Sequence, residues 1–160
     1  MPATIHLRTP TEDDAPALVP LFAELGYTVS EQAVRANVRD LANGQTDRSW
    51  VAESQMGVVG LISVHLTPLF HDTGFIGRIT SLVVHTPLRG SGVGSALVEA
   101  ARDFCWRAGC DRIELTSGDH RNQAHSFYER LGFQVHSRRF VMHRTPPNSS
   151  FKPKPLRGSA

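Results

Sequence analysis

A glycine-rich turn between an apolar run and a helical run, residues 84–95, carries the clearest chemical pattern of the sequence. Gly90, Gly92 and Gly94 stand at alternate positions, and Arg89 precedes them. Glycine lets the backbone approach a ligand because no Cβ stands in the way. The unpaired N–H groups of a helix's first turn suit a phosphate, and an arginine adds a donor fork. The pattern indicates a phosphorylated ligand; the alternative is a turn that only permits tight strand–helix packing.

Two phosphate-binding motifs compete for this turn. A P-loop requires Lys followed by Ser or Thr after its last glycine, but Ser95 and Ala96 follow here, so a P-loop is excluded. The dinucleotide pattern G-x-G-x-x-G/A fits Gly90 and Gly92, whereas Ser95 holds its last position. That pattern also expects several parallel strand–helix–strand units. Antiparallel hairpins are predicted before this turn, which disfavours dinucleotide binding.

The spacing that does fit is Arg-x-x-Gly-x-Gly, formed by Arg89, Gly92 and Gly94 after an apolar strand. A second pattern, RNQAHSFYERLGF, follows at residues 121–133. With both patterns in this order, the chain resembles the GNAT superfamily of N-acetyltransferases, whose second segment reads A-x-x-F-Y-E-x-x-G-F. The resemblance covers roughly residues 4–143.

The resemblance implies acetyl-CoA as co-substrate, with an amine attacking its thioester directly. It implies that backbone N–H groups of the turn hold the pyrophosphate, and that an apolar triplet on the preceding strand binds the pantetheine arm and the thioester carbonyl. Tyr128 would protonate the departing thiolate, the alternative being a core tyrosine on a helix. Arg121 stands where many members have Asn, and it either reaches a CoA phosphate or is a solvated helix start. The implied cofactor-binding residues are Leu82, Val83, Val84, Arg89, Gly90, Ser91, Gly92, Val93, Gly94, Ser95, Arg121 and Asn122.

The proton acceptor is left open by the resemblance. Many relatives carry Glu one or two residues before the apolar triplet, where this chain has Thr80 and Ser81. Neither side chain takes a proton near neutral pH. Histidine is the residue type that titrates nearest neutrality, so a histidine relay is one expectation; surface or packing roles, and an amine that needs no base, are the others. The candidate bases are His65, His71, Asp72 and Glu114.

Residues 60–84 are most similar, within the family, to the aminoalkylphosphonate N-acetyltransferases. The shared pattern is His65-Leu66, then His71, then Ile76-Gly77 before the apolar triplet. Those relatives have acids where this chain has Arg78 and Ser81, which puts a phosphonate substrate in doubt. We expect a primary amine of a small molecule. The alternatives are a protein N-terminus or lysine, and a non-catalytic acyl-CoA-binding module.

The elements that must position these residues follow from hydrophobic spacing and turn signals. A capping box at Thr11 begins the first helix, and Pro20 should kink or split it. The order strand, two helices, three strands, helix, strand, helix, strand predicts an α/β fold of the α+β kind. It resembles the three-layer GNAT fold, mostly antiparallel with one parallel crossover at the cofactor site. Strands are expected at 5–7, 49–53, 57–66, 75–84, 112–116 and 133–142, and helices at 11–25, 30–42, 93–108 and 122–131.

Length and composition bound the remaining possibilities. The 160 residues are 40% apolar and 20% charged, which is typical of one globular domain. We expect an acetyltransferase domain over residues 1–144 and a flexible, Pro-rich basic tail over 145–160. All 15 acidic residues precede Arg130, and seven of the 17 basic residues lie from Arg130 onward. No aromatic-interleaved basic face or helix-turn-helix accompanies them, so nucleic acid is not expected.

No apolar run reaches the ~20 residues of a membrane span, and no signal peptide is recognised. We therefore expect a cytoplasmic protein without a membrane partner. Cys105 and Cys110 allow no disulfide framework and match no metal site. Family members are often dimers, so the resemblance adds a homodimer to what we expect.

Overall fold

The computed structural model describes residues 4–42 and 44–144. The expected flexible tail, residues 145–160, therefore lies outside the described residues. By its contacts the chain divides into two compact units, Met1–Asn122 and Gln123–Ala160. The first unit contains the sheet and the helices that cover it, and the second contains most of the last helix.

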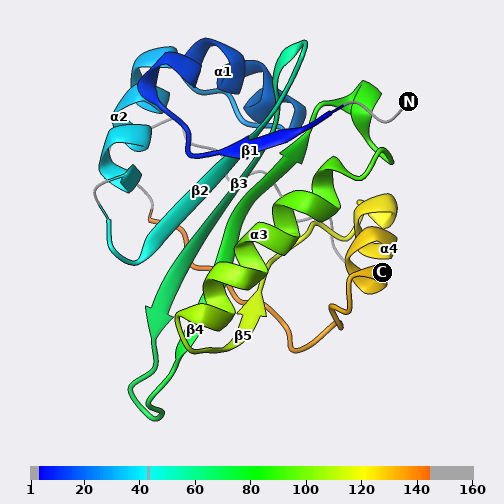
Figure 1. Cartoon of the computed structure of the whole chain (residues 1–160). Coiled ribbons are helices and arrows are strands. Elements are labelled where there is room, and N and C mark those ends of the chain that lie inside the picture. Colours follow the sequence, from blue (N-terminus) through cyan, green and yellow to red (C-terminus); the bar gives the residue numbers. More distant parts are fainter. Residues whose placement is uncertain (1–3, 43, 145–160) are drawn as a thin grey trace. The chain divides into compact units, whose positions relative to one another are not determined.

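A five-stranded sheet forms the centre of the first unit (Figure 1). Its strands are β1 (His6–Arg8), β2 (Asp47–Ser54), β3 (Gly57–Pro68), β4 (Phe75–Val84) and β5 (Cys110–Glu114), in that order across the sheet. Neighbours from β1 to β4 are antiparallel, and β5 runs parallel to β4. Helix α3 (Val93–Arg107) makes the long connection that a parallel pair requires. The predicted mixed sheet with one parallel crossover is confirmed.

Helices cover both faces of the sheet, which produces three layers (Figure 1). Helices α1 (Ala15–Glu24) and α2 (Glu31–Ala42) pack on one face and α3 packs on the other. Two adjacent residues of β3 show the alternation: Leu61 belongs to the core under α1 and α2, whereas a Cβ on Gly60 would lie 3.1 Å from Leu97 of α3. The core under α1 and α2 consists of Ala15, Leu18, Leu21, Val34, Val38, Val51, Leu61 and Val83.

Helix α3 lies close to β4 because β4 carries a glycine beneath it. A Cβ at Gly77 would collide with the Sγ atom of Cys105 on α3. Burial, with Cys110 nearby, raises the pKa of the Cys105 thiol to about 12. Burial also raises the pKa of Cys110. Both cysteines are therefore packing residues, because a thiol must ionise to act as a nucleophile or a metal ligand.

An ion pair at the edge of the sheet joins β1, β2 and the start of α1. The Arg8 guanidinium donates to both carboxylate oxygens of Asp14 at 2.8 Å, and to Glu53 at 2.9 and 3.2 Å. The Asp14 carboxylate also accepts the Thr11 N–H at 2.8 Å, which confirms the predicted capping box. The hydrogen bond from Arg8 outweighs burial and holds the pKa of Asp14 below its ordinary value. The box precedes a short 3-10 turn, η1 (Glu12–Asp14), that leads directly into α1.

The structure excludes the predicted split of the first helix at Pro20 and contradicts one predicted strand. Helix α1 is not split at Pro20 but runs continuously from Ala15 to Glu24. Proline removes one backbone hydrogen bond, and the burial of Leu18 and Leu21 on either side offsets that loss. The predicted strand at 133–142 does not form in the described residues.

The second unit accounts for the missing strand. Helix α4 (Asn122–Arg130) ends in a Schellman motif: Gly132, with a φ of +91°, donates to the Glu129 carbonyl, and Phe133 donates to the Tyr128 carbonyl, at 3.0 Å each. Beyond it, Ser137 has a φ of +27°, which interrupts an extended backbone. An alternating apolar pattern makes a strand only where a neighbouring strand accepts its hydrogen bonds. The exposed side chains of this stretch include Val135, Phe140 and Met142, at 92, 90 and 97%.

Among the described residues no helix is long and apolar enough to cross a membrane. The longest, α3, has 15 residues and carries charged side chains along its length.

The Asp14 carboxylate makes a testable contribution to stability. We expect Asp14→Asn to lower the free energy of unfolding by about 2 kcal/mol at pH 7, because charge-assisted hydrogen bonds are lost. The folded-state pKa of Asp14 is lowered, so this contribution is fully present above the unfolded-state value of ~3.9. It is lost as the pH falls through the lowered folded-state pKa. Urea unfolding of both proteins between pH 7 and pH 2.5 measures the difference.

The matched control is Asp13→Asn, because the Asp13 side chain is 99% exposed and approaches Arg35 only at 3.9 Å. We expect this variant to unfold like the unsubstituted chain at every pH. A difference between Asp14→Asn and the unsubstituted chain that does not shrink in acid would contradict the assignment.

Candidate active site

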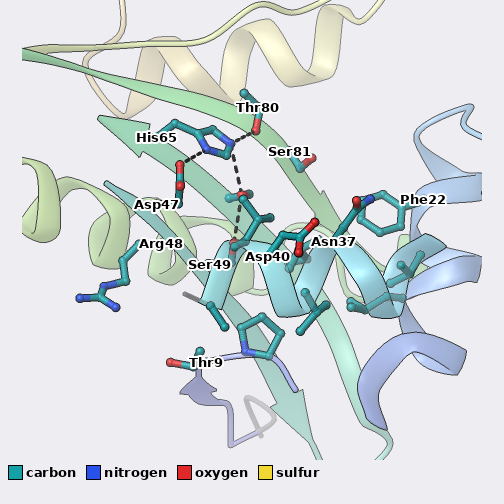
Figure 2. Close-up of a pocket in the computed structure, with 18 of the residues that line it drawn as sticks. Thr9, Phe22, Asn37, Asp40, Asp47, Arg48, Ser49, His65, Thr80 and Ser81 are labelled. Atoms are coloured by element: carbon teal, nitrogen blue, oxygen red, sulfur yellow. Dashed lines mark hydrogen bonds and ion pairs between the residues drawn. The ribbon is translucent and has the colours of Figure 1, made fainter. Parts of the chain in front are cut away.

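A cavity of about 510 Å³ lies between helices α1 and α2 and the adjoining strands (Figure 2). This volume is in the range of small-molecule sites. One wall is apolar and comes mostly from the helices and the loop between them; the strands and α2 supply the polar wall. The apolar wall includes Leu18, Phe22, Tyr27, Val29, Val34, Val38, Leu41 and Leu61. The polar lining residues include Asn37, Asp40, Asp47, Ser49, Ser63, His65, Thr80 and Ser81.

The pairing of β2 with β3 brings four of these polar side chains together. Asp47 stands opposite His65, and Ser49 stands opposite Ser63. Residues two apart on a strand share a face of the sheet, so both pairs point to the cavity. The Ser49 and Ser63 hydroxyls are 3.0 Å apart.

A bulge in β4 adds two neighbouring residues to the same wall. Ser81 pairs with Ser63 and Ile79 with Val64, so Thr80 is an extra residue without a partner on β3. Regular alternation would point Thr80 and Ser81 to opposite faces, but the bulge lets both line the cavity.

A chain of hydrogen bonds links the three strands at this point (Figure 2). His65 Nδ1 lies 2.6 Å from Asp47 Oδ1, and His65 Nε2 lies 2.6 Å from Thr80 Oγ1. Since a carboxylate can only accept, the Nδ1 atom carries a proton, and in the neutral ring Nε2 accepts from the Thr80 hydroxyl. The side chains of Asp47 and His65 are 25 and 27% exposed. The arrangement can take up a proton at Nε2 and stabilise the resulting imidazolium.

Of the four candidate bases only His65 lines the cavity. His71 and Asp72 lie in the loop between β3 and β4, where the Asp72 carboxylate accepts the Thr73 N–H at 2.7 Å. Glu114, at the end of β5, pairs with Arg112 at 2.8 Å and Arg78 at 3.6 Å. These contacts give Asp72 and Glu114 local structural roles.

Beyond the cavity, β4 separates from β5. The last pair is Arg78 with Glu114, and from Ile79 onward β4 has no strand partner on that side among the described residues. The predicted triplet Leu82–Val84 lies in this stretch. Because neighbouring residues of an antiparallel strand alternate in the direction of their backbone groups, part of the triplet's backbone faces the open edge. The Val83 side chain is buried in the core, so only its backbone is available to a ligand.

The glycine turn follows the triplet directly. A 3-10 turn, η2 (Thr86–Leu88), leads to Gly90 and Gly92, whose φ values of +80° and +93° favour glycine. Gly92 caps α3, so the unpaired N–H groups of the helix's first turn lie at residues 93–95. The residues from Arg89 to Gly92 are exposed, whereas the Val93 side chain is buried. The turn has the backbone geometry of an anion site.

Glu24, at the C-terminal end of α1, holds the start of this turn. Its carboxylate accepts hydrogen bonds from His85 Nδ1 at 2.6 Å, from the Thr86 N–H and hydroxyl at 3.0 and 2.8 Å, and from Arg89 at 3.2 Å. Burial alone would raise the pKa of Glu24, but the hydrogen bonds from His85 and Thr86 outweigh it and lower the pKa. Arg89 also donates to the Val84 carbonyl at 3.1 Å. Arg89, which the sequence predicts to bind a phosphate, therefore also stabilises the turn through these hydrogen bonds.

The remaining predicted residues lie at or beyond the boundary of the first unit. Arg121 and Asn122 are its last residues, and the Arg121 N–H donates to the Gly118 carbonyl at 3.0 Å. Tyr128 belongs to the second unit. There its half-buried ring contacts Phe127 and Phe133 edge to face, with centroids 5.4 and 5.8 Å apart. The contact with Phe133 is the apolar contact that accompanies a Schellman motif.

Sequence reasoning missed Asp47, Asp40, Asn37 and Glu24. The hairpin signal alone could not have found Asp47, because regular pairing outward from residues 54–57 places it opposite Val64, and only the bulge between Ala52 and Glu53 shifts it to His65. Asn37 and Asp40 stand at helical spacing on α2, but nothing local indicates that they face a cavity. Glu24 contacts residues more than 60 positions away, which no local pattern shows.

Comparisons with known proteins agree with this geometry. The pattern of the acetyltransferase (GNAT) family matches residues 11–133. The chain is 32% identical to the aminoalkylphosphonate N-acetyltransferase of Salmonella typhimurium over 149 residues, which cover 85% of this chain and 89% of that protein. It is 28% identical to the glucosamine 6-phosphate N-acetyltransferase of Trypanosoma brucei brucei, covering 84 and 92% of the two chains. An acetyltransferase structure from Trypanosoma brucei superposes with a TM-score of 0.74 at 27% identity, covering 88 and 100%.

Proposed function

The chain belongs to the acetyltransferase (GNAT) family, and we propose that it transfers the acetyl group of acetyl-CoA to a primary amine of a small molecule. One observation carries the proposal: β4 connects the cavity to the glycine turn. Thr80 and Ser81 line the cavity, the open-edged triplet follows, and the turn comes next. An amine in the cavity and an acyl-CoA along the strand would therefore meet at β4. The named relatives that act on aminoalkylphosphonate and glucosamine 6-phosphate support a small-molecule acceptor.

In this proposal the cofactor is held mainly by backbone. The N–H groups of residues 90–94 and of the first turn of α3 bind the pyrophosphate, with support from the side chains of Arg89, Ser91 and Ser95. The open edge at Leu82–Val84 binds the pantetheine arm and donates to the thioester carbonyl. That donor stabilises the oxyanion that forms when the amine attacks. Arg121 and Asn122 supply further polar contacts to the CoA phosphates.

His65 is the proposed general base. As the amine attacks the thioester carbon, its proton passes to the Thr80 hydroxyl oxygen while the hydroxyl proton moves to His65 Nε2. Asp47, on the other side of the ring, stabilises the imidazolium. The contacts at 2.6 Å on both ring nitrogens support this route. It supplies a proton acceptor at the position where the resemblance would place a strand glutamate.

Tyr128 is the proposed general acid. Collapse of the tetrahedral intermediate breaks the carbon–sulfur bond, and the phenol would give its proton to the departing CoA thiolate. Support for this role is the family pattern around residues 121–133, which is within the matched region.

The proposed function is tested by incubating the purified chain with acetyl-CoA and a panel of amines that includes polyamines, aminoglycosides, amino acids, aminoalkylphosphonates and peptides. We expect at least one small amine to be acetylated with release of an equal amount of CoA. Thiol titration measures the CoA, and mass spectrometry identifies the acetylated amine. Acetyl-CoA binding without turnover of any amine would instead favour a non-catalytic binding module, and turnover of peptides alone would favour a protein substrate.

Substituting the proposed base should slow the chemical step. We expect His65→Gln to lower kcat about 100-fold, in the range of general-base effects, while the affinity for acetyl-CoA stays within twofold. The control is His71→Gln, which changes a histidine outside the cavity. A kcat of His65→Gln within twofold of the unsubstituted chain would remove His65 from the mechanism.

Substituting the proposed acid separates its chemical role from its packing role. Tyr128→Phe keeps the ring contacts with Phe127 and Phe133. We expect an unchanged affinity for acetyl-CoA, and the melting temperature shows how far the substitution affects the fold. We expect kcat to fall at least tenfold because the hydroxyl group that would donate the proton is lost. Steady-state kinetics, calorimetry and thermal unfolding measure the three quantities. Full activity of Tyr128→Phe would show that the phenol is not the acid.

A further inference from the structure

The cavity offers negative charge but no positive charge that could bind an anion. Two carboxylates, Asp40 and Asp47, are among its lining residues. The one arginine or lysine among the described lining residues is Arg48. Its guanidinium lies over the Phe104 ring, 5.5 Å from the centroid.

The direction of Arg48 follows from strand alternation. Asp47 and Ser49 face the cavity, so Arg48 and Trp50 face the opposite side of β2. There Trp50 contacts Phe104 of α3 edge to face, with centroids 6.0 Å apart. Figure 2 shows the Arg48 guanidinium directed away from His65 and Asp40. Arg48 thus lies on the face of the sheet that α3 covers.

Asp40 is the carboxylate that remains for a ligand. Asp47 is engaged by His65 at 2.6 Å. The Asp40 carboxylate is exposed on α2 and has no side-chain hydrogen bond or ion pair among the described residues. Its electrostatic neighbour Arg39 is itself engaged in an ion pair at 2.7 Å. Figure 2 shows Asp40 and Asn37 on the part of α2 that faces the strands bearing His65 and Ser81. A cation bound at Asp40 would lie in the same cavity as the proposed base.

The rest of the cavity favours an uncharged, apolar body. Its apolar lining residues include Phe22, Tyr27, Val29, Val34, Leu41 and Leu61. A phosphonate, phosphate or carboxylate placed there would lose its hydration without gaining a cation, which is costly. It would also share the cavity with two carboxylates.

We propose that the acceptor is a primary amine with an apolar body and no anionic group, whose ammonium pairs with Asp40. The ammonium loses one proton to solvent before the amine attacks, and the proton released during the attack passes to His65. This specificity rests on the proposed acetyltransferase function and names the substrate class of the same site. It separates this chain from the two relatives named for phosphonate- and phosphate-bearing amines.

The test compares matched amines that differ in one anionic group: butylamine with 3-aminopropylphosphonate, and phenethylamine with phenylalanine. Calorimetry on the full chain without acetyl-CoA measures binding, and CoA release measures turnover. We expect the apolar member of each pair to bind at least tenfold more tightly and to show at least tenfold higher kcat/KM. Equal or tighter binding of the anionic members would overturn the specificity. Preferential binding of the apolar members without CoA release would uphold the specificity and overturn the acetyltransferase proposal alone.

Variants assign the effect to Asp40. We expect Asp40→Asn to weaken phenethylamine binding and raise its KM about tenfold, with kcat within twofold, and to narrow the preference over phenylalanine. The matched control is Asp103→Asn, an exposed aspartate on α3, which should change neither quantity. Asn37→Arg should raise the affinity for 3-aminopropylphosphonate because it adds the missing cation. An Asp40→Asn variant with unchanged amine affinity and KM would remove Asp40 from recognition.

Discussion

The hydrogen bond between Asp47 and His65 depends on the register of one antiparallel strand pair, and the candidate site depends on that bond. Asp47 begins β2 and His65 lies near the end of β3, so the whole length of the hairpin separates their positions from its turn. A slip of one residue would reverse the face to which each side chain points. The carboxylate would then leave the imidazole, and Nε2 would lose its fixed orientation toward Thr80. The catalytic chemistry we propose is thus a property of the sheet before it is a property of any one residue.

Helix α1 ties this strand pair to the glycine turn. Its central residues Leu18 and Phe22 line the cavity, while Glu24 at its end receives hydrogen bonds from the residues that open the turn. At its other end Asp14 is bound by Arg8 of β1. One helix therefore contacts both the amine side and the cofactor side of the proposed reaction. The bulge at Thr80 has a similar effect within the sheet, because it places a hydroxyl at the imidazole just before the strand opens toward the cofactor.

Local patterns predicted the parts of the fold that local chemistry determines. The run of β-branched residues in β4 and the spacing of apolar residues in α3 gave the observed bounds closely. Gly90 and Gly92 of the turn take the left-handed conformations that glycine permits. Local patterns could not predict interactions between segments that are far apart in the sequence. The sequence left His65 as one of four candidate bases. Its contacts with Asp47 of β2 and with Thr80 at the bulge of β4 distinguish it only in the folded chain. The prediction of a strand at 133–142 was wrong for the same reason. Alternation of apolar and polar residues indicates the two faces of a strand, but it does not show whether a neighbouring strand is present to pair with it.

Fixing α1 at both ends limits how the cavity can change its size. The helix cannot swing outward about one end without breaking either the Arg8–Asp14 pair or the hydrogen bonds of Glu24. Changes in acceptor size must then come from the side chains of the apolar wall or from the segment between α1 and α2, where Tyr27 is 62% exposed. Evolution or engineering of this chain toward larger amines is therefore confined to substitutions that shorten side chains or remodel residues 25–30, while the catalytic strands and the turn stay in place.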